Sequence, residues 1–163
     1  MDTEFELDPQ IHAQAAQIRK ALEFWLAKKD SRIAPSRDQF NLRETLAFAP
    51  HLQILDPLDD GEGYRQRLTG TAIVAQLKED PTGRTYRASS PDPTVQRMMA
   101  AIRWVLANRK PLRTVAHRTA LPGQDFVRHE TLFLPLSSDD SRIDMMAVVS
   151  SFTPVAKGPV TSP

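Results

Sequence analysis

The pattern of hydrophobic and polar positions changes its period in the middle of the chain. Residues 64–69 alternate with a period of two, which predicts a strand, and Gly70 ends it because glycine enters unusual backbone regions cheaply. Ile73, Val74 and Leu77 follow on one face of a short helix, and Thr71 is available to cap it. The chain therefore passes through a strand, a glycine corner and a short helix.

Two apolar stripes with helical spacing flank this corner. Asp8 with Pro9 and Asp92 with Pro93 each have the pattern of a helix start. The first stripe comprises Ile11, Ala15, Ile18, Leu22, Trp25 and Leu26. The second comprises Val95, Met98, Met99, Ile102, Val105 and Leu106, with Trp104 on the opposite side of the helix.

The first helix either packs on the protein's own sheet or forms a dimer, and one amphipathic stripe does not decide between these two arrangements. The candidate residues for contact with a second copy or a partner are Ile18, Leu22, Trp25 and Trp104. A homodimer is expected.

Strand-like segments occur on both sides of the second helix. They cover 51–56, 64–69, 112–119, 126–136 and 143–152. Because turn formers join them into hairpins, the sequence predicts an α+β fold with one five-stranded antiparallel sheet, helices on one face and an N-terminal amphipathic helix. Residues 1–30 are predicted to be an N-terminal helix extension, 31–153 the domain and 154–163 a flexible tail. Ser36 and Gln39 have the spacing of a capping box.

Composition narrows the functional classes. The net charge of +1 gives no general attraction to nucleic acid or to a membrane, and no apolar run is long enough to cross one. The acidic N-terminus lacks a signal-peptide pattern, so the protein is predicted to be cytoplasmic. The chain has no cysteine, which excludes disulfides, a cysteine nucleophile, covalently attached haem and flavin photochemistry that needs a cysteine.

Five short motifs occur in the order found in a known family. They are Phe24-Trp25, the loop 34–38, the stretch 64–71, Asp80-x-Thr82-Gly83-Arg84 and the stretch 134–140 before the last strand. In these motifs, over roughly residues 20–152, the chain resembles small stand-alone PAS-like proteins of bacteria. The resemblance implies a PAS fold and a sensory or regulatory role, and it names no ligand or reaction.

A PAS-like fold would place a cavity between the sheet and the middle helices. The predicted lining comprises Leu68, Ile73, Val74, Leu77, Met98, Met99, Ile102, Phe133 and Met145 or Val148. Methionines suit either a ligand cavity or an irregular filled core. The ligand, if there is one, is expected to be small and apolar or weakly polar, and no cofactor is identified.

Polar candidates lie near the corner and in the last hairpin. Arg65, Arg67 and Arg84 suit an anionic ligand or a partner's carboxylates, although salt bridges at exposed edges are the simpler interpretation. A turn centred on Gly123 would place His117 opposite His129, as half a metal site or a proton-sensitive pair. We favour two histidines without a ligand, and a register slip of one residue would separate them. No metal site is predicted.

Three functional hypotheses follow. The leading one is a regulatory module that signals through protein contacts and binds a small molecule in its cavity. The second is a ligand-free adaptor that dimerises through the N-terminal helix. The third is an enzyme on a similar cone-shaped fold, which would need an ionisable group among the pocket residues. The predicted lining contains none, so no catalytic residue is assigned.

Overall fold

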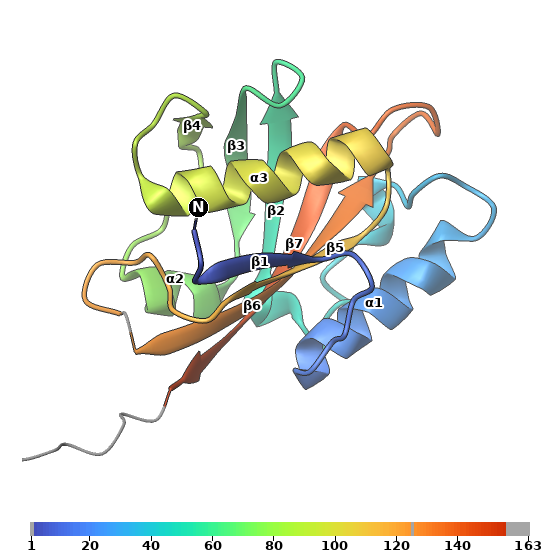
Figure 1. Cartoon of the computed structure of the whole chain (residues 1–163). Coiled ribbons are helices and arrows are strands. Elements are labelled where there is room, and N and C mark those ends of the chain that lie inside the picture. Colours follow the sequence, from blue (N-terminus) through green and yellow to red (C-terminus); the bar gives the residue numbers. More distant parts are fainter. Residues whose placement is uncertain (1, 125, 156–163) are drawn as a thin grey trace, which may run out of the picture.

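The computed structural model describes residues 2–124 and 126–155. Seven strands form one antiparallel sheet in the order β1-β5-β6-β7-β2-β3-β4 (Figure 1). The strands are β1 (Phe5–Asp8), β2 (Leu52–Leu58), β3 (Gly63–Thr69), β4 (Thr85–Arg87), β5 (Leu112–Ala116), β6 (Val127–Leu136) and β7 (Met145–Pro154). The helices are α1 (Ala16–Lys29), α2 (Thr71–Leu77) and α3 (Pro93–Asn108), with short 3-10 segments η1 (Arg37–Gln39) and η2 (Ala49–His51).

The centre of the sheet agrees with the prediction, and its edges do not. The first predicted strand, now β2, pairs with the last, β7, so that Leu52 lies opposite Val149. The structure adds β1 beside β5 and β4 beside β3, which gives seven strands instead of five. Strands of four and three residues are too short to show a period of two, and this is why the sequence pattern missed both.

Helices cover both faces of the sheet: the middle helices α2 and α3 share one face, as predicted, and α1, whose packing the sequence left open, covers the other. Val95, Met99 and Ile102 of α3 pack in a core cluster with Phe133 and Val148 on one face. On the other face, Ile18, Ala21 and Trp25 of α1 pack in a cluster with alternate strand residues, among them Leu132, Leu134 and Val149. The central strands are apolar on both faces, and each face therefore needs a cover.

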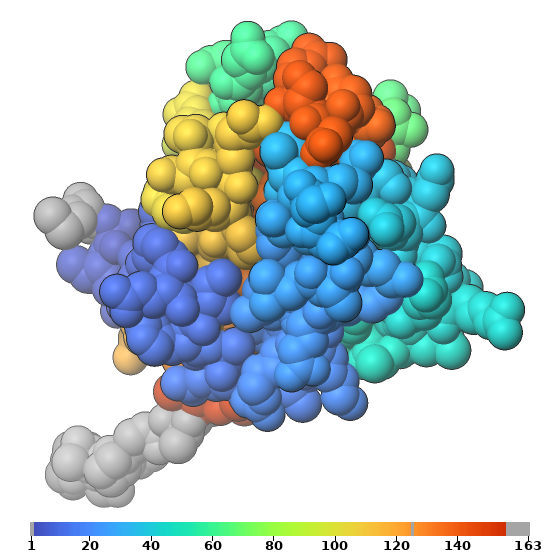
Figure 2. All heavy atoms as spheres, turned by 90° about the vertical axis from the view of Figure 1, so that its right-hand side faces the viewer, coloured from blue at the N-terminus to red at the C-terminus, as the bar shows by residue number. Residues whose placement is uncertain are grey.

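The α1 side forms a closed surface. Figure 2 shows α1 together with the segment that follows it covering this side of the sheet. The indole N–H of the buried Trp25 donates a hydrogen bond to the carbonyl oxygen of Pro135 over 2.8 Å. Ile18 and Trp25, which the sequence offered as contact residues for a dimer, are thus buried against the protein's own sheet.

The N-terminal helix predicted from Asp8 is not formed there. Residues 5–8 form strand β1, Ile11 has a left-handed backbone with φ +55, and α1 begins only at Ala16. The carboxylate of Asp8 accepts hydrogen bonds from Arg113 Nη1 over 2.9 Å and from the His12 backbone N–H over 2.8 Å. Asp8 therefore serves the sheet edge, whereas the same residue pair at Asp92-Pro93 does start a helix.

The residues just before α1 are anchored to the sheet. Both carboxylate oxygens of Glu130 on β6 accept backbone N–H groups, from Ala15 over 2.8 Å and from Gln14 over 2.9 Å. Arg113 Nε of β5 donates to the same carboxylate over 2.5 Å. Burial opposes the charged form of Glu130, but these three donors outweigh it and hold the pKa of its carboxyl below the ordinary value.

The glycine corner is confirmed, although its cause differs from the predicted one. Gly70 precedes α2 with an ordinary φ of −65. A Cβ on Gly70 would lie 2.4 Å from the carbonyl oxygen of Pro50 and 2.7 Å from that of Ala49. Close approach of the η2 backbone, and not an unusual dihedral angle, therefore requires glycine here. Thr71 is the first residue of α2 and does not cap it.

Two other local predictions are confirmed. The Asp92 carboxylate accepts the Thr94 backbone N–H over 2.8 Å and caps α3. Ser36 and Gln39 form the capping box of η1. Within residues 2–124 and 126–155, no helix combines the length and the apolar character that crossing a membrane requires.

Candidate ligand-binding site

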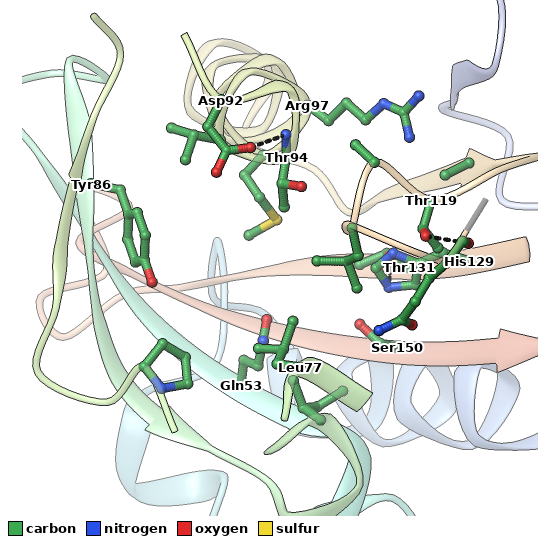
Figure 3. A pocket seen from close by; sticks show the side chains of 18 of the residues that line it. Gln53, Leu77, Tyr86, Asp92, Thr94, Arg97, Thr119, His129, Thr131 and Ser150 are labelled. Atoms are coloured by element: carbon green, nitrogen blue, oxygen red, sulfur yellow. Dashed lines mark hydrogen bonds between the residues drawn. The ribbon is translucent and has the colours of Figure 1, made fainter. Parts of the chain in front are cut away.

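A cavity of about 530 Å³ lies on the α3 side of the sheet (Figure 3). Strands β2, β3, β5, β6 and β7 supply its floor, and α2, β4, the N-terminal half of α3 and the loop 119–124 supply its walls. This volume is within the range of small-molecule sites in proteins. The cavity is therefore large enough for a ligand of moderate size.

The predicted apolar lining is correct in part. Ile73, Leu77, Met98 and Phe133 line the cavity. The other predicted residues lie outside the lining: Leu68, Val74, Met99, Ile102, Met145 and Val148. Met99, Ile102 and Val148 instead fill the solid core beneath the C-terminal half of α3, so the sequence merged this core with the cavity. Helical spacing identifies a buried face, but it does not show where along that face the packing stops.

A polar stripe, which the sequence analysis missed, crosses the floor of the cavity. Thr114 on β5 is in register with Thr131 on β6, and Thr131 is in register with Ser150 on β7. All three are buried, and Gln53 and Gln66 extend the polar floor toward β3. Among the described residues, no side-chain hydrogen bond is formed by Thr114, Ser150 or Gln53. Hydroxyl residues at inward positions of otherwise apolar strands were the available sequence signal.

His129 contributes an ionisable group to the same floor. Its ring stacks on Phe152 with the ring centres 4.1 Å apart, and its Nε2 lies 2.8 Å from the Thr131 hydroxyl oxygen. Burial, with a smaller contribution from the positive charge of Arg97, lowers the pKa of His129 from 6.5 to about 4. The imidazole is therefore neutral at pH 7.

The predicted pairing of His117 with His129 is wrong. His129 lies opposite Ala116 at the end of β5, one residue away from the expected register. His117 follows the strand, is exposed, and has its Nε2 3.4 Å from a carboxylate oxygen of Glu6. Because side chains alternate between the faces of a sheet, this shift of one residue separates the two imidazoles.

Both arginines of the cavity lie at its rim and form ion pairs. Arg84 donates to Glu79 over 2.8 Å and 3.3 Å. Arg97 donates to Asp2 over 2.7 Å and 3.1 Å, and this hydrogen bonding lowers the pKa of the Asp2 carboxyl. Of the other predicted arginines, Arg65 and Arg67 lie outside the lining, and Arg67 forms an ion pair with Asp56.

The loop between β5 and β6 is fastened over one side of the cavity. The side-chain amides of Gln76 and Gln124 hydrogen-bond to each other, and Gln124 Nε2 also donates to the Gln76 carbonyl oxygen over 2.9 Å. The Thr119 hydroxyl donates to the Gln124 carbonyl oxygen over 2.8 Å. The loop thereby joins α2 to the floor strands and narrows the opening.

The geometry agrees with the result of a comparison with protein families. A model of the PAS domain family matches residues 13–149, which is most of the chain. The chain belongs to the PAS domain family. A search among curated proteins finds no match. As a PAS domain, the protein is a sensory or regulatory module in general terms.

One part of the cavity comes from outside the matched PAS segment. Strand β1 precedes residue 13, and its Phe5 lines the cavity. Arg97 Cζ lies 5.5 Å from the centre of the Phe5 ring, in a cation–π contact, while its guanidinium binds Asp2. The N-terminal segment of this PAS domain therefore fixes the orientation of a rim arginine.

His129 is expected to make the PAS domain lose stability as the pH falls. Its folded-state pKa is depressed to about 4, so the unfolded chain takes up the proton first, below about pH 6.5. The contribution of His129 to the free energy of unfolding is fully present above pH 6.5. It decreases as the pH falls toward 4, by up to about 3 kcal/mol. His129→Phe should reduce this decline in urea denaturation at pH 7, 5.5 and 4. His117→Phe, at an exposed position, should leave the decline unchanged. If the free energy of unfolding falls equally with pH in both variants, His129 is not the cause of the decline.

Proposed function

We propose that this PAS domain binds a small molecule in the cavity and passes its occupancy on to protein partners. The observation that carries the proposal is a pair of buried residues, Thr114 and Ser150, which line the cavity and form no side-chain hydrogen bond among the described residues. Hydroxyls on the inner face of an otherwise apolar sheet are unfavourable unless they find a hydrogen-bonding partner, so a core that only stabilised the fold would favour apolar residues here. A ligand with polar groups supplies the missing partners.

The role of His129 supports recognition more than acid–base chemistry. Contrary to the expectation from sequence, the cavity does contain an ionisable group with a displaced pKa, which favours the enzyme hypothesis. A general base works best when its pKa lies near the working pH, and a pKa of about 4 is far below neutrality. We therefore assign His129 to hydrogen bonding with the ligand.

The adaptor hypothesis relies on an exposed apolar face of the N-terminal helix. Most of that face packs within the chain, because Ile18 and Trp25 of α1 are buried. Trp104, the candidate contact residue on α3, is partly buried beside the α3 core. Leu26 of α1 is 56% exposed, and Leu42 and Leu46 in the following segment are 71% and 67% exposed. These leucines, of which only Leu26 belongs to the predicted stripe, are the candidates for contact with a partner or a second copy.

Native mass spectrometry of gently purified protein tests the proposal. We expect an extra mass that is lost on denaturation in the wild type and in Ser31→Leu, which alters an exposed residue outside the lining. Ser150→Leu projects into the cavity and should abolish that mass while the protein stays folded. An extra mass that persists in Ser150→Leu would place the ligand elsewhere, and a bare wild type would favour the adaptor. The same spectra report the number of subunits.

A further inference from the structure

We infer that the ligand is uncharged at neutral pH and combines an aromatic ring with an amide or hydroxyl group. This inference rests on the proposed function and specifies the ligand of that same cavity. It follows from three features of the lining: compensated charges at the rim, neutral polar groups on the floor, and aromatic rings at two sides.

The two arginines at the rim are already compensated by acidic side chains. Arg84 is bound to Glu79, and Arg97 is bound to Asp2 and also donates to the Arg118 carbonyl oxygen over 2.8 Å. Figure 3 shows the Arg97 side chain directed away from the middle of the cavity. A carboxylate ligand would have to displace an acidic side chain from one of these arginines.

The two remaining charged groups of the lining are also unsuited to an ionic ligand. Asp92 is engaged as the cap of α3, and Lys78 is exposed at the end of α2. An ionised ligand inside the cavity would therefore lose its hydration and could gain an opposite charge only from these two exposed residues at the rim. That loss costs several kcal/mol per ion.

The floor is built from groups that both donate and accept hydrogen bonds without carrying a charge. Thr114, Thr131 and Ser150 present hydroxyls, Gln53 and Gln66 present amides, and His129 is neutral at pH 7. An amide or hydroxyl of the ligand pairs with such groups in either direction. The chemistry of the floor thus matches a neutral polar group.

Aromatic rings stand at two sides of this floor. Tyr86 is stacked on Tyr64 with ring centres 5.0 Å apart, and the ring of Phe152 is stacked on His129. Figure 3 shows Tyr86 and His129 on opposite sides of the cavity, and Met98 also lines it. Aromatic pairs and sulfur–aromatic contacts favour an aromatic ring between these walls.

Three probes that share the same indole group but differ in charge test the inference. Indole-3-acetamide is neutral, indole-3-acetate is an anion and tryptamine is a cation at pH 7. Calorimetric titration of the full chain should show the acetamide binding at least about tenfold more tightly than either charged probe. Ser150→Ala should weaken binding of the acetamide about fivefold by removing a hydrogen bond. The matched control is Ser151→Ala, because Ser151 lies on the other face of β7 and should leave binding unchanged.

The outcomes separate the ligand class from the proposed function. Tighter binding of the acetate or the amine would overturn the inference and leave the sensor function in place. If no probe binds, the charge of the molecule carried by gently purified protein decides: a neutral aromatic molecule supports the inference and an ionised one overturns it. A protein that binds no probe and carries no molecule would overturn both.

Discussion

Glu130→Ala is expected to lower the free energy of unfolding by about 3–5 kcal/mol, because it breaks a buried ion pair from one side. Arg113 is 4% exposed, and its Nη2 already lacks a hydrogen-bonding partner among the described residues. Without Glu130 the guanidinium keeps only Asp8 as its acidic partner. The same change removes the acceptors of the Gln14 and Ala15 backbone N–H groups, which directly precede α1. Urea denaturation at pH 7 measures the loss.

Two further variants separate the ion pair from a general effect of removing an acid. Glu6→Ala removes an exposed carboxylate on β1 and should change stability by less than about 0.5 kcal/mol. The double variant Arg113→Met/Glu130→Leu, which replaces the pair by apolar side chains, should be less destabilised than Glu130→Ala. A double variant that is less stable than the single one would contradict the interpretation that the unpaired cation is the main cost.

The same pair sets part of the pH dependence. The pKa of Glu130 is depressed in the folded state, so its contribution to stability is present above the unfolded pKa, about 4.3, and is lost as the pH falls through the folded value. In Glu130→Gln this decline in acid should become smaller.

Gly70→Ala is expected to cost about 3 kcal/mol, at the upper end of the range for overpacking a rigid site. The new Cβ would meet the carbonyl oxygens of Pro50 and Ala49, which are backbone atoms and cannot rotate away. The Gly70 N–H also donates to the Leu52 carbonyl oxygen over 2.7 Å, so a shift of the corner would strain the link to β2.

Thermal unfolding of matched alanine variants checks this expectation. Thr71→Ala changes the next residue, which is exposed and makes no cap hydrogen bond, and should leave the melting temperature nearly unchanged. A Gly70→Ala variant as stable as Thr71→Ala would show that η2 yields easily, and the close approach would then not explain the glycine.

Sequence patterns predicted the elements whose causes are local. The helix cap at Asp92 and the capping box of Ser36 and Gln39 each depend on residues within a few positions of one another. The start of α1 depends instead on Glu130, more than 100 positions away in the chain. Spacing in the sequence carries no information about such a partner, and the pattern at Asp8 was therefore misleading.

The candidate site was predictable in its apolar part only. Ile73, Leu77, Met98 and Phe133 were identified because helix and strand periods mark inward positions. The polar floor was missed because Thr114 and Ser150 have the same appearance in a sequence as hydroxyls on a solvated face. The predicted histidine pair was wrong because the strand register differs from the predicted one by a single residue, and the length of the β5–β6 loop does not fix that register.

The short outer strands have a consequence for how another chain could bind to the sheet. A long exposed edge is a template on which another chain can add a strand and extend the sheet. Here β1 and β4 end the sheet after four and three residues, and each shields the longer strand beside it. Backbone pairing at the sheet edges is therefore disfavoured, which protects the protein from assembling edge to edge. A partner of the kind proposed above would then have to bind the side-chain surfaces of the helices and loops.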